Sequence, residues 1–139
     1  MVDVNFYECA KDALFKFAVI VSKHNGKWVF CKHKERNTYE FPGGHREQNE
    51  PIYETAKREL WEETGAIKYH LEPICVYSVK KDAEETFGML YFADIIEFEN
   101  LPPLEMEKIE LFDELPTQWT YPLIQPLLLE QIIKRKFAK

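Results

Sequence analysis

Three glutamates, Glu59, Glu62 and Glu63, lie within five residues of one another, just before Gly65. The segment from Pro51 to Thr64 is predicted to form a helix, because proline suits a first helical turn and glycine a C-terminal stop. At about 100° per residue, the three carboxylates share one face of that helix. This placement is unfavourable in isolation, because Glu59 and Glu63 repel each other at i,i+4 and the helix C-terminus prefers cations.

The unfavourable cluster indicates a positive charge that the local sequence does not supply. Hard carboxylate oxygens suit Mg²⁺, with Mn²⁺ as an alternative, and Mg²⁺ commonly combines one or two carboxylates with water and substrate phosphates. A bound ion would convert repulsion among the glutamates into coordination and would complement the helix C-terminus. An ordinary solvated acidic face is the alternative interpretation, and it leaves the repulsion unexplained.

A longer pattern surrounds these glutamates, reading GHREQNEPIYETAKRELWEETGA from Gly44 to Ala66. It resembles the signature of the Nudix hydrolase family, G-x5-E-x7-R-E-U-x-E-E-x-G-U, where U is a bulky aliphatic residue. The spacing agrees throughout, and the one departure is the small Ala66 at the last position. The flanking stretches EFPGG at 40–44 and LFDELP at 111–116 are also similar to Nudix sequences.

The resemblance implies a role for each matching residue. The three glutamates, together with the carbonyl oxygen of Gly43, would be the metal ligands. Arg58, Glu59 and Glu62 would be the catalytic residues, with Arg58 orienting a glutamate through a charge-assisted hydrogen bond and Glu59 as one candidate general base. Glu50 would be either an outer metal ligand or a favourable acid at the helix N-terminus.

The implied reaction is metal-dependent hydrolysis of a nucleoside diphosphate linked to a further group. Compact MutT-like members suggest a nucleoside triphosphate, oxidised dGTP included, cleaved to monophosphate and pyrophosphate. Nucleotide sugars and dinucleotides are alternative substrates, and a non-catalytic nucleotide-binding module is an alternative function. In some relatives the base comes from a loop outside the motif, and Glu105 and Glu107 are candidates for that role.

Substrate-binding residues are predicted from a local excess of positive charge. Residues 23–46 contain six Lys or Arg against two Glu. Arg36 and Arg46 are candidates for binding phosphates, and Tyr39 and Phe41 for stacking on a base. The alternatives are a solvated strand edge for the charges and core packing for the aromatic rings.

Composition limits the partners and the location. The net charge of −6 argues against general binding of nucleic acid polymers, which needs a basic surface. The longest apolar run, FAVIV at 17–21, is far shorter than a membrane span requires. Neither a signal peptide nor a CxxC motif is visible, so we expect a cytoplasmic protein with reduced thiols and no membrane partner. A homodimer is common in the resembled family, but no residue marks an interface.

These residues must be positioned by an α+β fold. We expect a mixed β-sheet between helices, an α/β/α sandwich, in a single domain spanning 1–139 with its motif at 44–66. Asn25 and Gly26 predict a hairpin turn. Strands are expected at 13–23, 27–33, 71–81, 86–98 and 108–112, a short extended piece at 38–41, and helices at 51–64 and 122–136.

Overall fold

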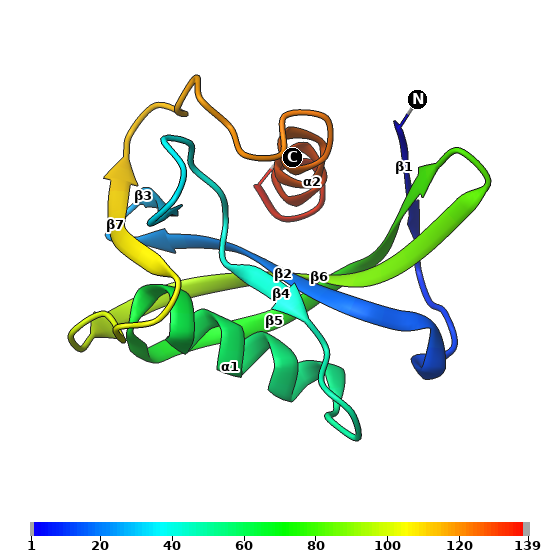
Figure 1. Cartoon of the computed structure of the whole chain (residues 1–139), viewed down its shortest axis with the longest axis horizontal. Coiled ribbons are helices and arrows are strands. Elements are labelled where there is room, and N and C mark those ends of the chain that lie inside the picture. The colour runs from blue at the N-terminus through cyan, green and yellow to red at the C-terminus, as the bar shows by residue number, and fades with distance from the viewer. Residues whose placement is uncertain (1, 138–139) are drawn as a thin grey trace.

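Among the residues that the structure describes, a mixed seven-stranded sheet forms the centre, with one helix on each face (Figure 1). The structure is a computed structural model, and it describes residues 2–137. The sheet order is β1-β5-β6-β2-β3-β7, and β4 pairs with β2. The predicted α+β architecture is confirmed. Its elements are β1 (Val2–Tyr7), β2 (Phe15–His24), β3 (Lys27–His33), β4 (Gly43–His45), α1 (Ile52–Thr64), β5 (Ala66–Lys81), β6 (Glu84–Phe98), β7 (Met106–Phe112) and α2 (Gln125–Ile132).

The sheet is buried on both faces, and β2 shows this most directly. Val19 and Val21 belong to the core cluster beneath α2, whereas Ala18 and Ile20 belong to the cluster beneath α1. Because successive strand residues point to opposite faces, a strand covered on both sides must be apolar at every position. This explains the continuous apolar run that the sequence shows at 17–21.

The two helices contribute one apolar stripe each. Ala56 and Leu60 of α1 are fully buried against one face, and Leu128 and Ile132 of α2 are fully buried against the other. Both helices were expected, although α2 begins later than 122. It is followed by a short π-helix over Ile133–Phe137.

The hairpin between β2 and β3 has the predicted turn. Asn25 and Gly26 both adopt positive φ values, 51° and 80°, which a two-residue hairpin turn requires. Lys23 and His24 pair with Trp28 and Lys27 across this turn.

Several strand boundaries differ from the prediction. β1 was not predicted, although its residues alternate between half-buried and exposed positions, and it pairs with the end of β5. The strand before α1 is β4 at Gly43–His45, whereas 38–41 contributes only isolated bridges at Tyr39 and Glu40. β5 begins at Ala66 and not at 71, because its first residues pair with the end of β6.

The remaining features concern cysteines and membrane spans. Cys31 and Cys75 are buried, Cys9 is exposed, and all three are free thiols. None of the helices between residues 2 and 137 is both long enough and apolar enough to span a membrane.

Candidate active site

The end of α1 delivers the glutamates to the glycines of β4. Gly65 ends the helix in the left-handed conformation at φ 78°, and its N–H donates to the carbonyl of Trp61 at 2.8 Å. A side chain at this position would also lie 2.7 Å from the carbonyl oxygen of Glu99. Glycine is therefore required both by the backbone conformation and by the space, and it sets Glu62 and Glu63 in the last helical turn.

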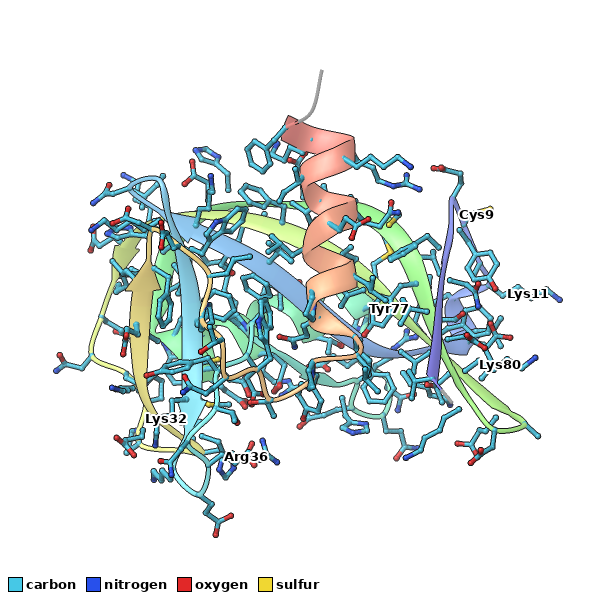
Figure 2. All side chains as sticks on the ribbon, turned by 90° about the horizontal axis from the view of Figure 1, so that it is seen from above. Cys9, Lys11, Lys32, Arg36, Tyr77 and Lys80 are labelled. Carbon is cyan, nitrogen blue, oxygen red and sulfur yellow. The ribbon has the colours of Figure 1, made fainter. Side chains whose placement is uncertain are left out.

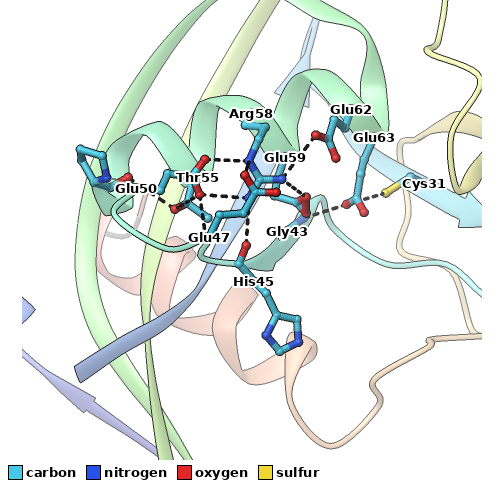
Figure 3. A network of polar contacts seen from close by, with 11 residues as sticks. Cys31, Gly43, His45, Glu47, Glu50, Thr55, Arg58, Glu59, Glu62 and Glu63 are labelled. Atoms are coloured by element: carbon cyan, nitrogen blue, oxygen red, sulfur yellow. Dashed lines mark hydrogen bonds and ion pairs between the residues drawn. The ribbon is translucent and has the colours of Figure 1, made fainter. Parts of the chain in front are cut away.

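Arg58 connects the acidic residues of the site (Figure 3). Its Nε and Nη2 donate to the two oxygens of Glu50 at 2.7 and 3.0 Å. Its Nη1 donates to Glu59 Oε1 at 3.0 Å and to Glu62 Oε2 at 3.3 Å. Nη2 also donates to the His45 carbonyl at 2.9 Å, which ties α1 to the strand that contains the glycines. One guanidinium therefore orients two of the predicted metal ligands.

Glu50 is held by several donors besides Arg58. Thr55 Oγ1 donates to its Oε1 at 2.7 Å, and the Glu47 N–H donates to the same oxygen at 3.1 Å. The Arg58 hydrogen bond is the main reason that the pKa of Glu50 falls to about 2. These contacts identify Glu50 as the anchor of Arg58, and its proposed role as an outer metal ligand stays a prediction.

Glu59 and Glu63 are buried acids, with 8% and 6% of their surfaces exposed. Burial raises the pKa of Glu59 to about 7 and that of Glu63 to about 9. Glu63 Oε1 accepts a hydrogen bond from the Gly43 N–H at 2.9 Å and a weaker one from the Cys31 thiol at 4.0 Å. No guanidinium or ammonium contacts Glu63 among the described residues, so its charged form lacks a partner.

Gly44 allows the closest approach between β4 and α1. A Cβ at this position would overlap the Glu59 carboxylate, so any side chain here would displace that acid. The motif therefore requires glycine at position 44, because the Glu59 carboxylate occupies the space that a side chain would need.

The donor set suits a hard divalent cation. Three carboxylates from consecutive turns share one helix face, and two of them are buried with raised pKa values. Within residues 2–137 no group of three or more His, Cys, Asp or Glu side chains is already gathered around one point. Instead, Arg58 Nη1 bridges Glu59 and Glu62. The metal roles of the glutamates and of the Gly43 carbonyl stay predictions.

The raised pKa values predict that the metal-free protein loses stability as pH rises. A carboxyl whose pKa is higher in the folded than in the unfolded protein binds more protons when folded. The free energy of unfolding therefore decreases as the pH rises from the unfolded pKa to the folded pKa. For Glu59 and Glu63 this window runs from about 4.3 to about 7 and 9. We expect the Tm without metal to be lower at pH 8.5 than at pH 5.5 by about 10 °C or more, measured by thermal unfolding.

The same measurement has an internal control. Above about pH 5 Glu50 is ionised in both states and contributes a constant amount, so it does not affect the comparison. Saturating Mg²⁺ should remove most of the pH dependence, because a bound ion favours the charged carboxylates. The double variant Glu59→Gln/Glu63→Gln should show a much smaller pH dependence without metal, with a remainder from Glu40, whose pKa is also raised by burial. A parent profile that is flat, or that rises with pH, would contradict the interpretation.

A cavity of about 270 Å³ adjoins Gly43 and Gly44. Its walls come from the sheet and from the start of α2, and most of them are apolar. Its polar lining side chains are those of Glu40, His45, Thr86, Tyr121 and Gln125. The apolar and aromatic lining includes Phe17, Val19, Phe41, Tyr77, Val79 and Leu128.

Of the predicted substrate-binding residues, Phe41 and Arg36 lie at or beside this cavity. Phe41 is 1% exposed, stacks on Phe30 with ring centroids 4.3 Å apart, and lines the cavity. Arg36 donates to Glu40 Oε1 at 3.3 Å, and Glu40 lines the cavity.

The other two substrate-binding candidates have partners elsewhere in the protein. Tyr39 packs against the core and donates its hydroxyl to Glu110 at 3.0 Å, and it does not line the cavity. All three guanidinium nitrogens of Arg46 donate within the protein, to Asp12 and to backbone carbonyls that include that of Glu50. Arg46 therefore connects the motif loop to the N-terminal region.

The two alternative base candidates differ in their surroundings. Glu107 is part of β7 and lies 2.8 Å from Lys32 Nζ, which lowers its pKa. Glu105 precedes β7, lies 3.8 Å from His33 Nε2 and is close enough to Glu63 to contribute to its raised pKa. Glu105 is thus the nearer of the two to the candidate site.

Sequence reasoning did not identify Glu40, Tyr77 or Gln125 as site residues. They come from segments far apart in the sequence, and none is marked by the motif spacing. For Glu40 the position directly before Phe41, within EFPGG, was the one available signal.

Comparison with known proteins identifies related sequences. Residues 15–124 match the family model of the NUDIX domain. YtkD of Bacillus subtilis (strain 168), provisionally named an 8-oxo-dGTP diphosphatase, is 37% identical over 102 residues. This alignment covers 73% of the chain but only 64% of YtkD, so the chain spans less than two thirds of that relative's length.

Solved structures show the same architecture. The crystal structure of the Bacillus subtilis pyrophosphohydrolase BsRppH superposes with a TM-score of 0.81 at 28% identity, covering 99% of this chain and 93% of that one. A NUDIX hydrolase from Nitrosomonas europaea superposes with a TM-score of 0.70 over 85% of this chain and 87% of that one. Its 18% identity makes it a likeness of fold alone.

Proposed function

Because the chain belongs to the Nudix family, we propose that it is a metal-dependent hydrolase of phosphoric anhydride bonds in nucleotides. The substrate favoured is a nucleoside triphosphate, oxidised dGTP included, cleaved to monophosphate and pyrophosphate. The observation that carries the proposal is the arrangement of Glu59 and Glu63 against Gly43 and Gly44, directly beside a cavity of about 270 Å³.

Each residue of the motif has a role in this proposal. Glu59, Glu62, Glu63 and the Gly43 carbonyl would hold Mg²⁺, or Mn²⁺ in its place. When bound, the ion neutralises phosphate oxygens and lowers the pKa of the attacking water. Glu59 would accept the proton of the attacking water as the general base. Arg58 holds Glu59 and Glu62 in position through its Nη1.

The substrate class rests on the cavity and on the relatives. An apolar, partly aromatic cavity beside the acidic site suits a planar base whose phosphates reach the glutamates. The provisional name of YtkD and the name of BsRppH both describe action on diphosphate or pyrophosphate groups, which agrees with this substrate class. The net charge of −6 favours a small nucleotide over a nucleic acid polymer. A cytoplasmic location and a homodimer are further proposals.

A hydrolysis panel tests the function. The protein is incubated with Mg²⁺ and then Mn²⁺ against normal and oxidised nucleoside triphosphates, ADP-ribose, nucleotide sugars and dinucleoside polyphosphates. Separation of the products distinguishes release of pyrophosphate from release of single phosphates. We expect metal-dependent turnover of the triphosphates with monophosphate as product. Preferred turnover of nucleotide sugars or dinucleotides would replace the substrate assignment, and metal-dependent binding with no turnover of any class would favour a non-catalytic module.

A further inference from the structure

Tyr77 is a buried tyrosine in the cavity wall that the proposed mechanism does not use. It belongs to β5, pairs with Gly88 of β6, and is 4% exposed. Figure 2 labels it beside the start of α2. A Cβ at Gly88 would lie 2.6 Å from the phenol ring and from its oxygen, so the ring rests on a glycine that leaves room for it.

The Tyr77 hydroxyl is open to the cavity. Within residues 2–137 no hydrogen bond joins it to another protein group. Every fully enclosed side-chain nitrogen or oxygen in that part of the chain has a hydrogen-bond partner. The oxygen is therefore not fully enclosed, and Tyr77 is one of the residues that line the cavity. Burial raises the pKa of Tyr77, so the hydroxyl remains protonated and able to donate near neutral pH. A polar group in so apolar a wall requires a hydrogen-bonding partner.

Gln125 presents a second donor to the same cavity. Its Oε1 accepts a hydrogen bond from the Phe41 N–H at 2.7 Å, which fixes the orientation of the amide. The side chain is 4% exposed, and the one hydrogen bond that it makes within residues 2–137 uses this oxygen and not the amide nitrogen. Glu40, the buried acid of this wall, is already paired with Arg36 at 3.3 Å. The Tyr77 hydroxyl and the Gln125 amide nitrogen can both donate, so they are complementary to an acceptor on a ligand.

We propose that Tyr77 is a specificity-determining residue and that its hydroxyl donates a hydrogen bond to a carbonyl oxygen of the substrate's base. This inference rests on the proposed function, because it assigns the cavity to the base of a nucleotide whose phosphates lie at Glu59 and Glu63. A buried donor discriminates strongly against a ligand without the matching acceptor, since the donor is then left unpaired. A base with a carbonyl oxygen is therefore favoured over one without it.

Two ligands and two variants test the proposal. Inosine 5′-triphosphate carries a carbonyl on its purine ring, and purine riboside 5′-triphosphate has the same ring system without it. We expect Tyr77→Phe to raise KM and the equilibrium Kd for the inosine ligand about three- to tenfold, with kcat unchanged. Its effect on the purine riboside ligand should stay within about twofold. Kd is measured by calorimetry with Ca²⁺ in place of Mg²⁺, so that binding is read without turnover.

Tyr91→Phe is the matched control. Tyr91 is a strand tyrosine with 2% exposure, but it belongs to the core cluster on the α1 side of the sheet. We expect this variant to bind both ligands as the parent does. A further variant, Gly88→Ala, forces the Tyr77 ring to move and should weaken binding of both ligands.

Other results would contradict the role of Tyr77 or the proposed function. Equal losses for both ligands in Tyr77→Phe would assign the hydroxyl a structural role and overturn the proposal, as would behaviour identical to Tyr91→Phe. A parent protein that binds both ligands but hydrolyses no nucleotide would contradict the proposed function and leave the inference about Tyr77 open to test. The calorimetric comparison would then still decide the role of Tyr77. A parent that binds neither ligand would overturn this inference.

Discussion

Replacing Glu63 by Gln is expected to reduce metal-dependent turnover about 10²–10³-fold while the free protein keeps its fold, because the proposed ion contributes several kcal/mol of charge stabilisation. Burial raises the pKa of Glu63 to about 9, so near neutral pH the metal-free protein already holds this side chain in its neutral form. Glutamine reproduces the volume of that form and can still accept the Gly43 N–H bond, now 2.9 Å long. The loss should therefore appear only when a charged ligand is needed.

The measurement combines kcat under saturating Mg²⁺ with thermal unfolding in the absence of metal. Glu54→Gln is the matched control, because Glu54 is in the first turn of the same helix and its one ion pair within residues 2–137 is with Lys57, at 3.6 Å. That variant should retain activity within about twofold. Parent-like turnover in Glu63→Gln would refute the metal assignment. A large drop in its metal-free Tm would contradict the neutral state of Glu63.

Replacing Arg58 by Ala is expected to cause the largest loss of stability, about 2–4 kcal/mol or roughly 6–15 °C in Tm. The guanidinium is the shared partner of Glu50, Glu59 and Glu62, and among the described residues its removal leaves these three neighbouring acids without a paired cation. Loss of its bond to the His45 carbonyl also leaves β4 joined to α1 by fewer hydrogen bonds, with that of Gly43 to Glu63 remaining. Arg58→Lys should be intermediate, because an ammonium cannot donate to both Glu50 oxygens in the planar geometry of arginine.

Thermal unfolding with and without Mg²⁺ tests this expectation. Arg135→Ala is the control, because Arg135 pairs with the exposed Glu8 at 3.1 Å and such surface pairs contribute at most about 1 kcal/mol. Mg²⁺ should restore more stability to Arg58→Ala than to the parent, since the ion replaces the missing positive charge at Glu59 and Glu62. Equal destabilisation by the two arginine variants would show that Arg58 is not the organising cation.

The amino-acid sequence by itself determined the acidic helix face and the family. Helical periodicity alone places Glu59, Glu62 and Glu63 together, and Gly65 alone predicts where the helix stops, because both depend on local backbone geometry. The hairpin at Asn25 and Gly26 was predictable for the same reason. Strand boundaries were less so, since β1 and the start of β5 exist through pairing with distant strands.

Only the tertiary structure decided which charges are already paired and where the cavity lies. The structure pairs Arg46, a predicted phosphate-binding residue, with Asp12 and the Glu50 carbonyl, and it pairs Glu107 with Lys32. The substrate-binding role of Arg46 stays a prediction. The cavity likewise joins Tyr77 of β5 to Gln125 of α2. Burial, ion pairing and cavity shape depend on contacts between segments far apart in the chain, and no local spacing encodes them.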